Sequence, residues 1–316
     1  MLPTLEQIRE ARRVIAGSAI RTPLVRLNVL DAPAEIYLKL ENLQPIGSFK
    51  IRGAANAIGH TPPEQLARGV YTASAGNMAQ GVAWRARELG IPCAVVVPEH
   101  APEAKLAAIK RLGGEIIKAP FDAWWQVILT HRYEGLDGLF VHPVSNTHVM
   151  AGNGSIGIEI LEDLPDVDAV IIPYGGGGLS SGIATAIRAL KRDTKVYACE
   201  VETAAPLAAS LAAGALQEVN YTPSFVDGIG SKSVLPEMWP LVSRLLDDSL
   251  VVSLDEVATA LKLLAERNRV IAEGAGACPV AAALSGKAGS GKIVCVVSGG
   301  NIDLSKLCVI LEKDGH

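Results

Sequence analysis

The sequence lacks several features that would mark a specialised class of protein. Its formal net charge is −4, so it has no basic excess of the kind with which general nucleic-acid binders neutralise phosphates. No apolar run reaches the roughly 18 residues that a membrane-spanning helix needs. We therefore expect neither a nucleic-acid partner nor insertion into a membrane.

The five cysteines form no recognisable pattern. They are scattered without C-x-x-C spacing, and Cys93, Cys199 and Cys295 lie in apolar runs typical of buried strands. Such spacing indicates neither a zinc site nor a disulfide framework, so we predict reduced thiols and a cytoplasmic protein. The N-terminal segment is no secretory signal, because it predicts an amphipathic helix with a capping box at Thr4 and Gln7.

Short hydrophobic runs alternate with helical patterns along most of the chain, whose 316 residues suit two domains. The runs are nearly continuous in hydrophobicity, which is typical of strands buried on both faces of a parallel sheet. The helical patterns carry end signals, such as a capping box from Ser253 to Glu256 and a closing Gly90. We therefore predict an α/β protein with open sheets. The predicted strands are 69–76, 93–98, 115–118, 139–143, 169–176, 195–201 and 292–300.

Ligands of such sheets bind at turns that follow the carboxyl ends of the strands. The clearest of these turns has four consecutive glycines, Gly175 to Gly178, between a predicted strand and a predicted helix. Glycine lets backbone amides approach a ligand closely, and the start of a helix carries partial positive charge. Four glycines cost conformational entropy without an evident packing return, so we predict a phosphate-binding loop rather than an empty tight turn.

Two other phosphate motifs fit less well. A dinucleotide site needs G-x-G-x-x-G; Glu200 ends the next predicted strand as its acid would, but Ser180 or Ser181 occupies the third glycine position. The stretch GKAGSGK at 286–292 imitates a P-loop, but no Ser or Thr follows Lys292, and a strand comes next instead of a helix. We interpret 286–292 as a surface turn.

Two further turns carry polar groups after predicted strands. Residues 74–77 read Ser-Ala-Gly-Asn and offer exposed amides suited to a carboxylate, although Ser74 or Asn77 would equally serve as an ordinary helix cap. Ser298 ends a buried strand ahead of two glycines, where its hydroxyl would equally cap the next turn. Neither turn identifies a ligand by itself.

One lysine, Lys50, lies between Phe49 and Ile51 in the stretch QPIGSFKIRGA. Apolar surroundings lower the pKa of a lysine amine and make the neutral amine available as a nucleophile. A surface lysine whose stem covers apolar groups has the same local sequence. The stretch alone favours the surface interpretation.

Five motifs together resemble the fold-type II pyridoxal-phosphate enzymes, and among them the serine/threonine dehydratases (threonine ammonia-lyases) and serine racemases. The motifs are GSFKIRGA, SAGNMAQG, GGGGLSSG, EGAGA and SGGN, and they occur in the family's order over nearly the whole chain. The resemblance implies two open, twisted, mostly parallel sheets flanked by helices, as in the tryptophan synthase β subunit. It also implies a homodimer, pyridoxal 5'-phosphate as cofactor, a large cofactor-binding domain (1–58 and 147–316) and a small substrate-loop domain (59–146).

The resemblance assigns a role to each matching residue. Lys50 would hold the cofactor as a Schiff base and remove the substrate α-proton, and Phe49 would pack against the pyridine ring. Asn77 would hydrogen-bond the ring hydroxyl, Ser298 would be the partner of the pyridine nitrogen, and Glu273 would be a carboxylate beside the cofactor. The substrate carboxylate would be gripped by the loop of Ser74, Ala75 and Gly76, with Asn77 at its end. The phosphate would be bound by Gly175, Gly176, Gly177, Gly178 and Leu179.

The residue types favour one reaction. A serine hydroxyl cannot keep a proton on the pyridine nitrogen as a carboxylate would, so elimination is favoured over transamination. The resemblance thus implies a lyase that converts a threonine- or serine-like 3-hydroxy amino acid to a 2-oxo acid and ammonia. The alternatives are a β-replacement synthase or a racemase on the same scaffold, and a non-enzymatic nucleotide-binding module. The EGAGA motif and Ala75 favour the dehydratase.

Some positions depart from the family's pattern. Ala75 stands where the racemases carry a serine, and a methyl group cannot move a proton. Met78 replaces a usual histidine, and Tyr174 replaces a small aliphatic residue. The sequence therefore does not determine which side chain the amino-acid substrate carries. Glu200 matches the first carboxylate of the racemases' cation site, but Pro206 stands where the second would be. We therefore expect no metal there.

Overall fold

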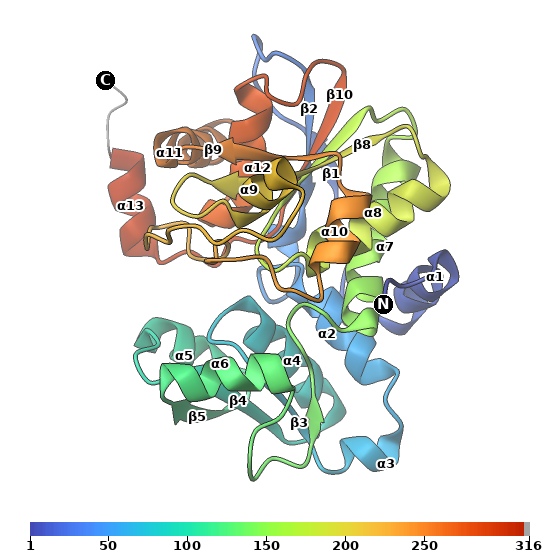
Figure 1. The fold of residues 1–316 in the computed structure, drawn as a ribbon, viewed down its shortest axis with the longest axis vertical. Coiled ribbons are helices and arrows are strands. Elements are labelled where there is room, and N and C mark those ends of the chain that lie inside the picture. Colours follow the sequence, from blue (N-terminus) through green and yellow to red (C-terminus); the bar gives the residue numbers. More distant parts are fainter. Residues whose placement is uncertain (313–316) are drawn as a thin grey trace.

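The computed structural model describes residues 1–312, which form two α/β lobes (Figure 1). The larger lobe contains a six-stranded sheet in the order β1-β2-β10-β7-β8-β9, and the smaller a four-stranded sheet in the order β5-β4-β3-β6. The described strand pairs are parallel except β1 with β2. The predicted fold class, two mostly parallel sheets flanked by helices, is confirmed.

The seven predicted strands are present close to their predicted positions, although several end earlier than predicted, whereas β1, β2 and β9 were not predicted. The residues after β3, β6, β7 and β10 leave the sheets as loops. The six-stranded sheet contains β1 (Leu24–Arg26), β2 (Glu35–Leu40), β7 (Ala169–Pro173), β8 (Lys195–Val201), β9 (Asp248–Val252) and β10 (Lys292–Val297). The four-stranded sheet contains β3 (Val70–Ala73), β4 (Cys93–Pro98), β5 (Glu115–Ala119) and β6 (Leu139–Phe140).

The helices begin and end largely at the signals that the sequence carries. Both predicted capping boxes are present, and Gly90 closes its helix with a φ of 66°. The helices are α1 (Leu5–Val14), α2 (Lys50–Gly59), α3 (Pro63–Leu66), α4 (Asn77–Leu89), α5 (Glu103–Arg111), α6 (Phe121–Thr130), α7 (Thr147–Asp163), α8 (Gly178–Leu190), α9 (Pro206–Ala213), α10 (Trp239–Leu245), α11 (Leu254–Leu263), α12 (Gly274–Leu284) and α13 (Leu304–Glu312). Two shorter turns are η1 (Glu41–Leu43) and the π-helical η2 (Leu264–Asn268).

Both faces of the six-stranded sheet are buried. Ile171 and Cys295 belong to the hydrophobic cluster that includes residues of α11 and α12, whereas Val170 and Val294 belong to the cluster that includes residues of α7 and α8. This two-sided burial explains why the central strands read as continuous hydrophobic runs. The four buried cysteines and the exposed Cys308 are free thiols, as predicted.

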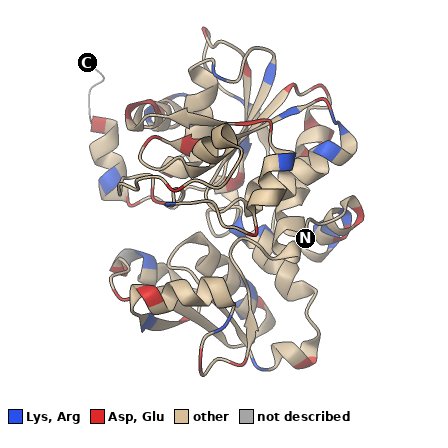
Figure 2. Ribbon diagram, viewed as in Figure 1, with Lys and Arg blue, Asp and Glu red and all other residues tan. Residues whose placement is uncertain are grey.

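The chain passes between the lobes twice, through α2 and α3 into the smaller sheet and then from β6 into α7 (Figure 1). Strands β3 to β6 fall within the proposed small domain, residues 59–146. Lysines and arginines are mixed with acidic residues in both lobes (Figure 2). Among the described residues, no helix combines the length and apolar character needed to cross a bilayer.

A buried ionic network lies beneath the start of α2. Arg52 pairs with Glu41 at 2.8 Å and with Glu159 at 2.7 Å, and Lys39 pairs with Glu159 at 2.6 Å. All four side chains are at most 3% exposed, and their formal charges cancel. Charges buried this deeply are tolerated only when paired, so the network fixes the position of α2 against β2 and α7.

Candidate active site

A cavity of about 540 Å³ is lined by residues of both lobes. Its walls include the loops that follow β3, β4, β7 and β10, where a sheet of this class binds its ligands. The structure brings every predicted site residue to this cavity. They are Phe49, Lys50, Ser74, Ala75, Gly76, Asn77, Gly175, Gly176, Gly177, Gly178, Leu179, Glu273 and Ser298.

Lys50 is the first residue of α2, and its side chain lines the cavity. Its Nζ donates a hydrogen bond to the carbonyl of Pro143 at 2.9 Å and lies 5.1 Å from the centre of the Phe49 ring. Burial lowers the pKa of the Lys50 amine to about 8, although the Glu273 carboxylate opposes this shift. The amine therefore lies in the cavity. The interpretation as a surface lysine, which the stretch alone favours, is wrong.

The four glycines form the turn from β7 into α8. Gly177 precedes the helix with a φ of 94°, a conformation that other residues rarely adopt. A Cβ on Gly176 would lie 2.5 Å from Val144 Cγ2, and one on Gly178 would lie 2.6 Å from the Val144 carbonyl oxygen. The expectation that these glycines bring no packing return is therefore wrong, because they let the turn pack tightly against Val144.

Three polar side chains form a chain along another wall of the cavity. Asn77 Nδ2 donates to Glu273 Oε1 at 2.9 Å, and Asn301 Nδ2 donates to Asn77 Oδ1 at 2.8 Å. Asn301 also donates to the carbonyl of Ile46 at 2.8 Å, which connects this wall to the loop before Lys50. Glu273 accounts for one of the two hydrogens on Asn77 Nδ2, so Asn77 can also donate to a ligand.

Glu273 is buried, and a second carboxylate, that of Asp227, also lines the cavity. Burial raises the pKa of Glu273 to about 7, and Asp227 raises it as well, while the hydrogen bond from Asn77 and the charge of Lys105 oppose the shift. Lys105 of α5 pairs with Asp227 at 2.9 Å, and both line the cavity. A carboxyl group with this pKa exchanges protons near neutral pH.

We expect Asp227→Asn to lower the pKa of Glu273, because the negative charge of Asp227 raises it. Between pH 4.5 and about 7, folded Glu273 binds a proton that an unfolded glutamate has released. This group therefore makes the protein less stable as pH rises through that window. Between about pH 5 and about pH 7.5, the melting temperature of Asp227→Asn should therefore fall less than the melting temperature of the parent. Glu273→Gln lacks the titrating carboxyl group, so its melting temperature should also fall less than that of the parent. An equal fall would mean that Glu273 does not cause the pH dependence.

The other two predicted turns also line the cavity. Ser298 follows β10 and is buried, and its carbonyl accepts a hydrogen bond from the amide of Phe49 at 3.0 Å. Residues 74–77 lead into α4, where the Ser74 hydroxyl accepts from the Gly76 amide at 3.2 Å. Met78 is buried beside this turn and lines the cavity.

The residues weighed for other sites lie apart from the cavity lining. Glu200 accepts from the amides of Leu207 and Ala208 at 2.9 and 2.8 Å, so it caps α9, which begins at Pro206. The stretch 286–292 is a series of turns between α12 and β10. Tyr174 is buried behind the glycine turn, where a Cβ on Gly177 would lie 3.2 Å from its hydroxyl oxygen.

Sequence reasoning missed several residues of the cavity wall. Asn301 belongs to the SGGN motif and Pro143 and Val144 to the stretch HPVSN, so their neighbourhood carried a signal. No sequence signal points to Lys105 and Asp227, which lie 122 positions apart and meet only in the fold.

A family model described as pyridoxal-phosphate dependent enzyme matches residues 15–299. The chain belongs to this family. The predicted resemblance is thus confirmed, and so is pyridoxal phosphate as the cofactor.

Relatives of this pyridoxal-phosphate enzyme include L-threonine ammonia-lyase of Thermotoga maritima. It is 43% identical over 315 residues, which cover 98% of this chain and 78% of that protein. Among solved structures, maize serine racemase has a TM-score of 0.91 at 35% identity and covers 99% of this chain and 98% of its own. The processed form of threonine deaminase isoform 2 from Solanum lycopersicum has a TM-score of 0.88 at 32% identity, with 98% of this chain and 90% of its own covered.

The residues in the cavity fit pyridoxal phosphate chemically. Lys50 offers an amine for its aldehyde, and the glycine turn with the start of α8 offers amides for its phosphate. Asn77 offers a donor for its ring oxygen and Ser298 a hydroxyl for its ring nitrogen. Val144, which packs against the glycine turn, lines the cavity as well.

Proposed function

We propose that this enzyme is an ammonia-lyase that dehydrates L-threonine and L-serine to a 2-oxo acid and ammonia. The observation that carries the proposal is that Lys50 and Ala75 line the same cavity. An amine that moves protons is present there, while the second residue of the Ser74–Asn77 turn has only a methyl group. The name of the Thermotoga maritima relative supports the same reaction.

In the proposed mechanism, Lys50 and the glycine turn would hold pyridoxal phosphate, which would supply the electron withdrawal that makes the substrate α-proton acidic. Lys50 Nζ takes that proton, because with a pKa of about 8 a useful fraction of the amine is neutral near neutral pH. The turn of Ser74, Ala75 and Gly76 would hold the substrate carboxylate at the start of α4 through the Ala75 amide and the Ser74 hydroxyl, because the Ser74 amide donates to the Val96 carbonyl and the Gly76 amide to the Ser74 hydroxyl. The loss of water and a final hydrolysis then release the 2-oxo acid and ammonia.

The remaining side chains orient these groups. Phe49 lies against the Lys50 amine and forms an apolar wall for the cofactor ring. Asn77 is held by Glu273 on one side and Asn301 on the other, so its amide has a fixed direction. Ser298 supplies a neutral partner for the ring nitrogen, which disfavours a long-lived carbanion.

The reaction is tested with a panel of amino acids. The purified protein is incubated separately with L-threonine, L-serine, D-serine and O-acetyl-L-serine plus a thiol, and 2-oxo acids and thioether products are quantified. The proposal predicts 2-oxo acid from the two L-hydroxy amino acids. Preferential formation of a thioether would instead identify a β-replacement synthase.

Serine racemization is the second candidate, because the fold matches maize serine racemase closely. Racemization needs proton transfer on both faces of the planar carbon, and Ala75, which stands where the racemases carry a serine, has no group that transfers a proton. One positioned acid or base commonly contributes about 10²–10⁴ in rate, so the parent should form little D-serine. Ala75→Ser should raise D-serine formation about tenfold or more.

Chiral chromatography of the serine reaction measures this difference, with Ala75→Gly as a control that changes the side chain without adding a hydroxyl. Equal D-serine from Ala75→Ser and Ala75→Gly would argue against the role of this position. Abundant D-serine from the parent would favour the racemase.

We further propose that the protein is a cytoplasmic homodimer with residues 59–146 as its small domain. Its free cysteines suit a reducing compartment, and the resemblance to the family supports the dimer. Light scattering of the purified protein measures the oligomeric state.

A further inference from the structure

The turn from His142 to Ser145 touches both halves of the cofactor site. The carbonyl of Pro143 accepts the hydrogen bond from Lys50 Nζ at 2.9 Å. Val144 makes the close contacts with the glycine turn described above. A displacement of these few residues would therefore move the wall behind the amine and the wall behind the phosphate loop together.

The imidazole of His142 holds this turn in shape. Its Nδ1 accepts hydrogen bonds from the amide of Val144 at 3.0 Å and from the amide of Ser145 at 2.8 Å, and the Ser145 hydroxyl lies 3.1 Å away. Because two N–H groups point at Nδ1, that nitrogen carries a lone pair, and the neutral ring carries its hydrogen on Nε2.

His142 keeps this form over a wide pH range. The ring is 2% exposed, and the titratable groups near it are His131 from the end of α6, Lys50 from α2 and Glu237 from the turn before α10. Burial, followed by His131 and then Lys50, lowers the pKa of His142 to about 3. Its Nδ1 is therefore a hydrogen-bond acceptor near neutral pH.

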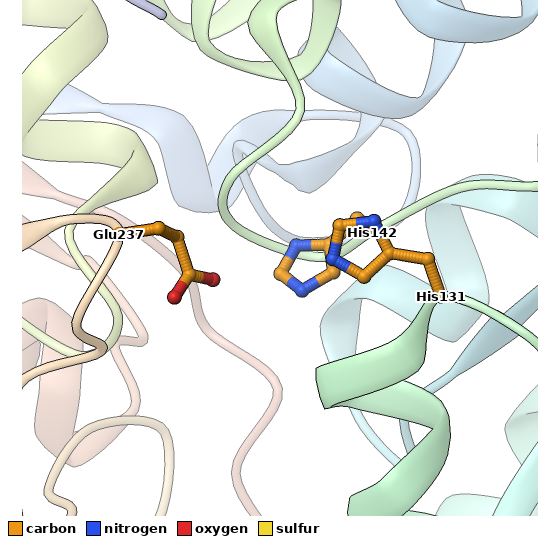
Figure 3. A group of neighbouring side chains, drawn as sticks. All are labelled: His131, His142 and Glu237. Atoms are coloured by element: carbon orange, nitrogen blue, oxygen red, sulfur yellow. The ribbon is translucent and has the colours of Figure 1, made fainter.

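The His142 ring also belongs to a polar cluster. One ring nitrogen each of His131 and His142 and one carboxylate oxygen of Glu237 lie within 4.8 Å of one another, and Figure 3 shows the three side chains converging. Among residues 1–312, His142 Nε2 is buried, and the backbone of Ile128 nearby opposes the lowering of the His142 pKa. A histidine that binds a metal through one nitrogen usually donates a hydrogen from the other. Here Nδ1 accepts instead, so Nε2 carries the hydrogen and the cluster does not suit a metal.

We propose that His142 is a positioning residue of the active site: its Nδ1 folds residues 143–145 so that the Pro143 carbonyl holds the Lys50 amine and Val144 covers the glycine turn. This rests on the assignment of Lys50 and the glycine turn to the cofactor. His142 touches neither substrate nor cofactor in this role and acts through the backbone that it folds.

Two substitutions separate the two edges of the ring. His142→Asn places an oxygen near the position of Nδ1, whereas His142→Gln places its amide near Nε2. We expect His142→Asn to keep the cofactor dissociation constant within about threefold of the parent value. His142→Gln should raise this constant about tenfold, because the amides of Val144 and Ser145 lose their acceptor. Glu237→Gln is the matched control and should leave this constant unchanged. Tight cofactor binding in His142→Gln with weak binding in His142→Asn would overturn the proposal.

A second measurement needs no variant to function. In the parent holoenzyme labelled with ¹⁵N-histidine, the His142 signals are identified by their absence from His142→Gln among the six histidines. Nδ1 should lack a hydrogen and Nε2 should carry one, without change between about pH 6 and pH 9. A hydrogen on Nδ1, or titration in that range, would overturn the proposal. Failure to release 2-oxo acid with these signals as expected would count against the dehydratase and not against His142.

Discussion

Lys50→Ala will abolish turnover and leave the protein unable to hold its cofactor covalently. The amine lies in the cavity beside Phe49, and burial lowers its pKa to about 8, so it is available both to bind an aldehyde and to accept a proton. A single positioned base contributes up to about 10⁴ in rate, so kcat should fall by at least about that factor. Lys50→Arg should fail as well, because a guanidinium keeps its proton.

Borohydride reduction followed by peptide mapping checks the assignment. In the parent, the pyridoxyl group should be found on Lys50, and in Lys50→Ala no peptide should carry it. Lys105 also lines the cavity, so Lys105→Ala is the matched control and should keep the full label on Lys50. A label on Lys105 in the parent would contradict the account.

Gly177→Asp will weaken cofactor binding about 100-fold, or by about 3 kcal/mol. Gly177 is the cap of α8, and its φ of 94° is strained for any residue with a Cβ. A Cβ there would lie 3.1 Å from Val242 and 3.2 Å from Tyr174, so both would have to shift slightly. The new carboxylate would also compete with the phosphate for the amides at the start of α8.

Gly177→Asn separates shape from charge, since asparagine has nearly the same shape and is among the residues that best tolerate positive φ. It should weaken cofactor binding only about tenfold, and the difference between the two variants measures the repulsion of the phosphate. Equilibrium titration of each variant with pyridoxal phosphate gives the two constants. Equal affinities for Asp and Asn would mean that no anion is bound at this turn.

The sequence predicted the parts of the fold that depend on local patterns. The central strands are buried on both faces, so their hydrophobic runs were visible, and glycines at the ends of β7 and β10 marked the binding edge. Strand β2 was missed because Lys39 and Glu35 interrupt its hydrophobic run. Lys39 is buried only because Glu159, 120 positions away, neutralises it. Local patterns carry no information about such a partner.

In the candidate site, too, local patterns were visible in the sequence and distant partners were not. Residues inside motifs, such as Lys50 and Ser298, are candidates on the strength of the five motifs alone. The partners that set their chemistry come from distant segments: Pro143 holds the Lys50 amine, and Asp227 raises the pKa of Glu273. The tight packing of Val144 against the glycine turn was likewise not visible in the sequence, and it changes the reason why glycines occupy that turn.

The most direct test of the central claim is simultaneous quantification of 2-oxo acid and ammonia released from L-threonine by the purified holoenzyme. We expect both products in equal amounts, at the same rate as threonine disappears, and neither product with Lys50→Ala. Consumption of L-threonine without ammonia, or accumulation of its D-isomer in place of a 2-oxo acid, would contradict the assignment as an ammonia-lyase.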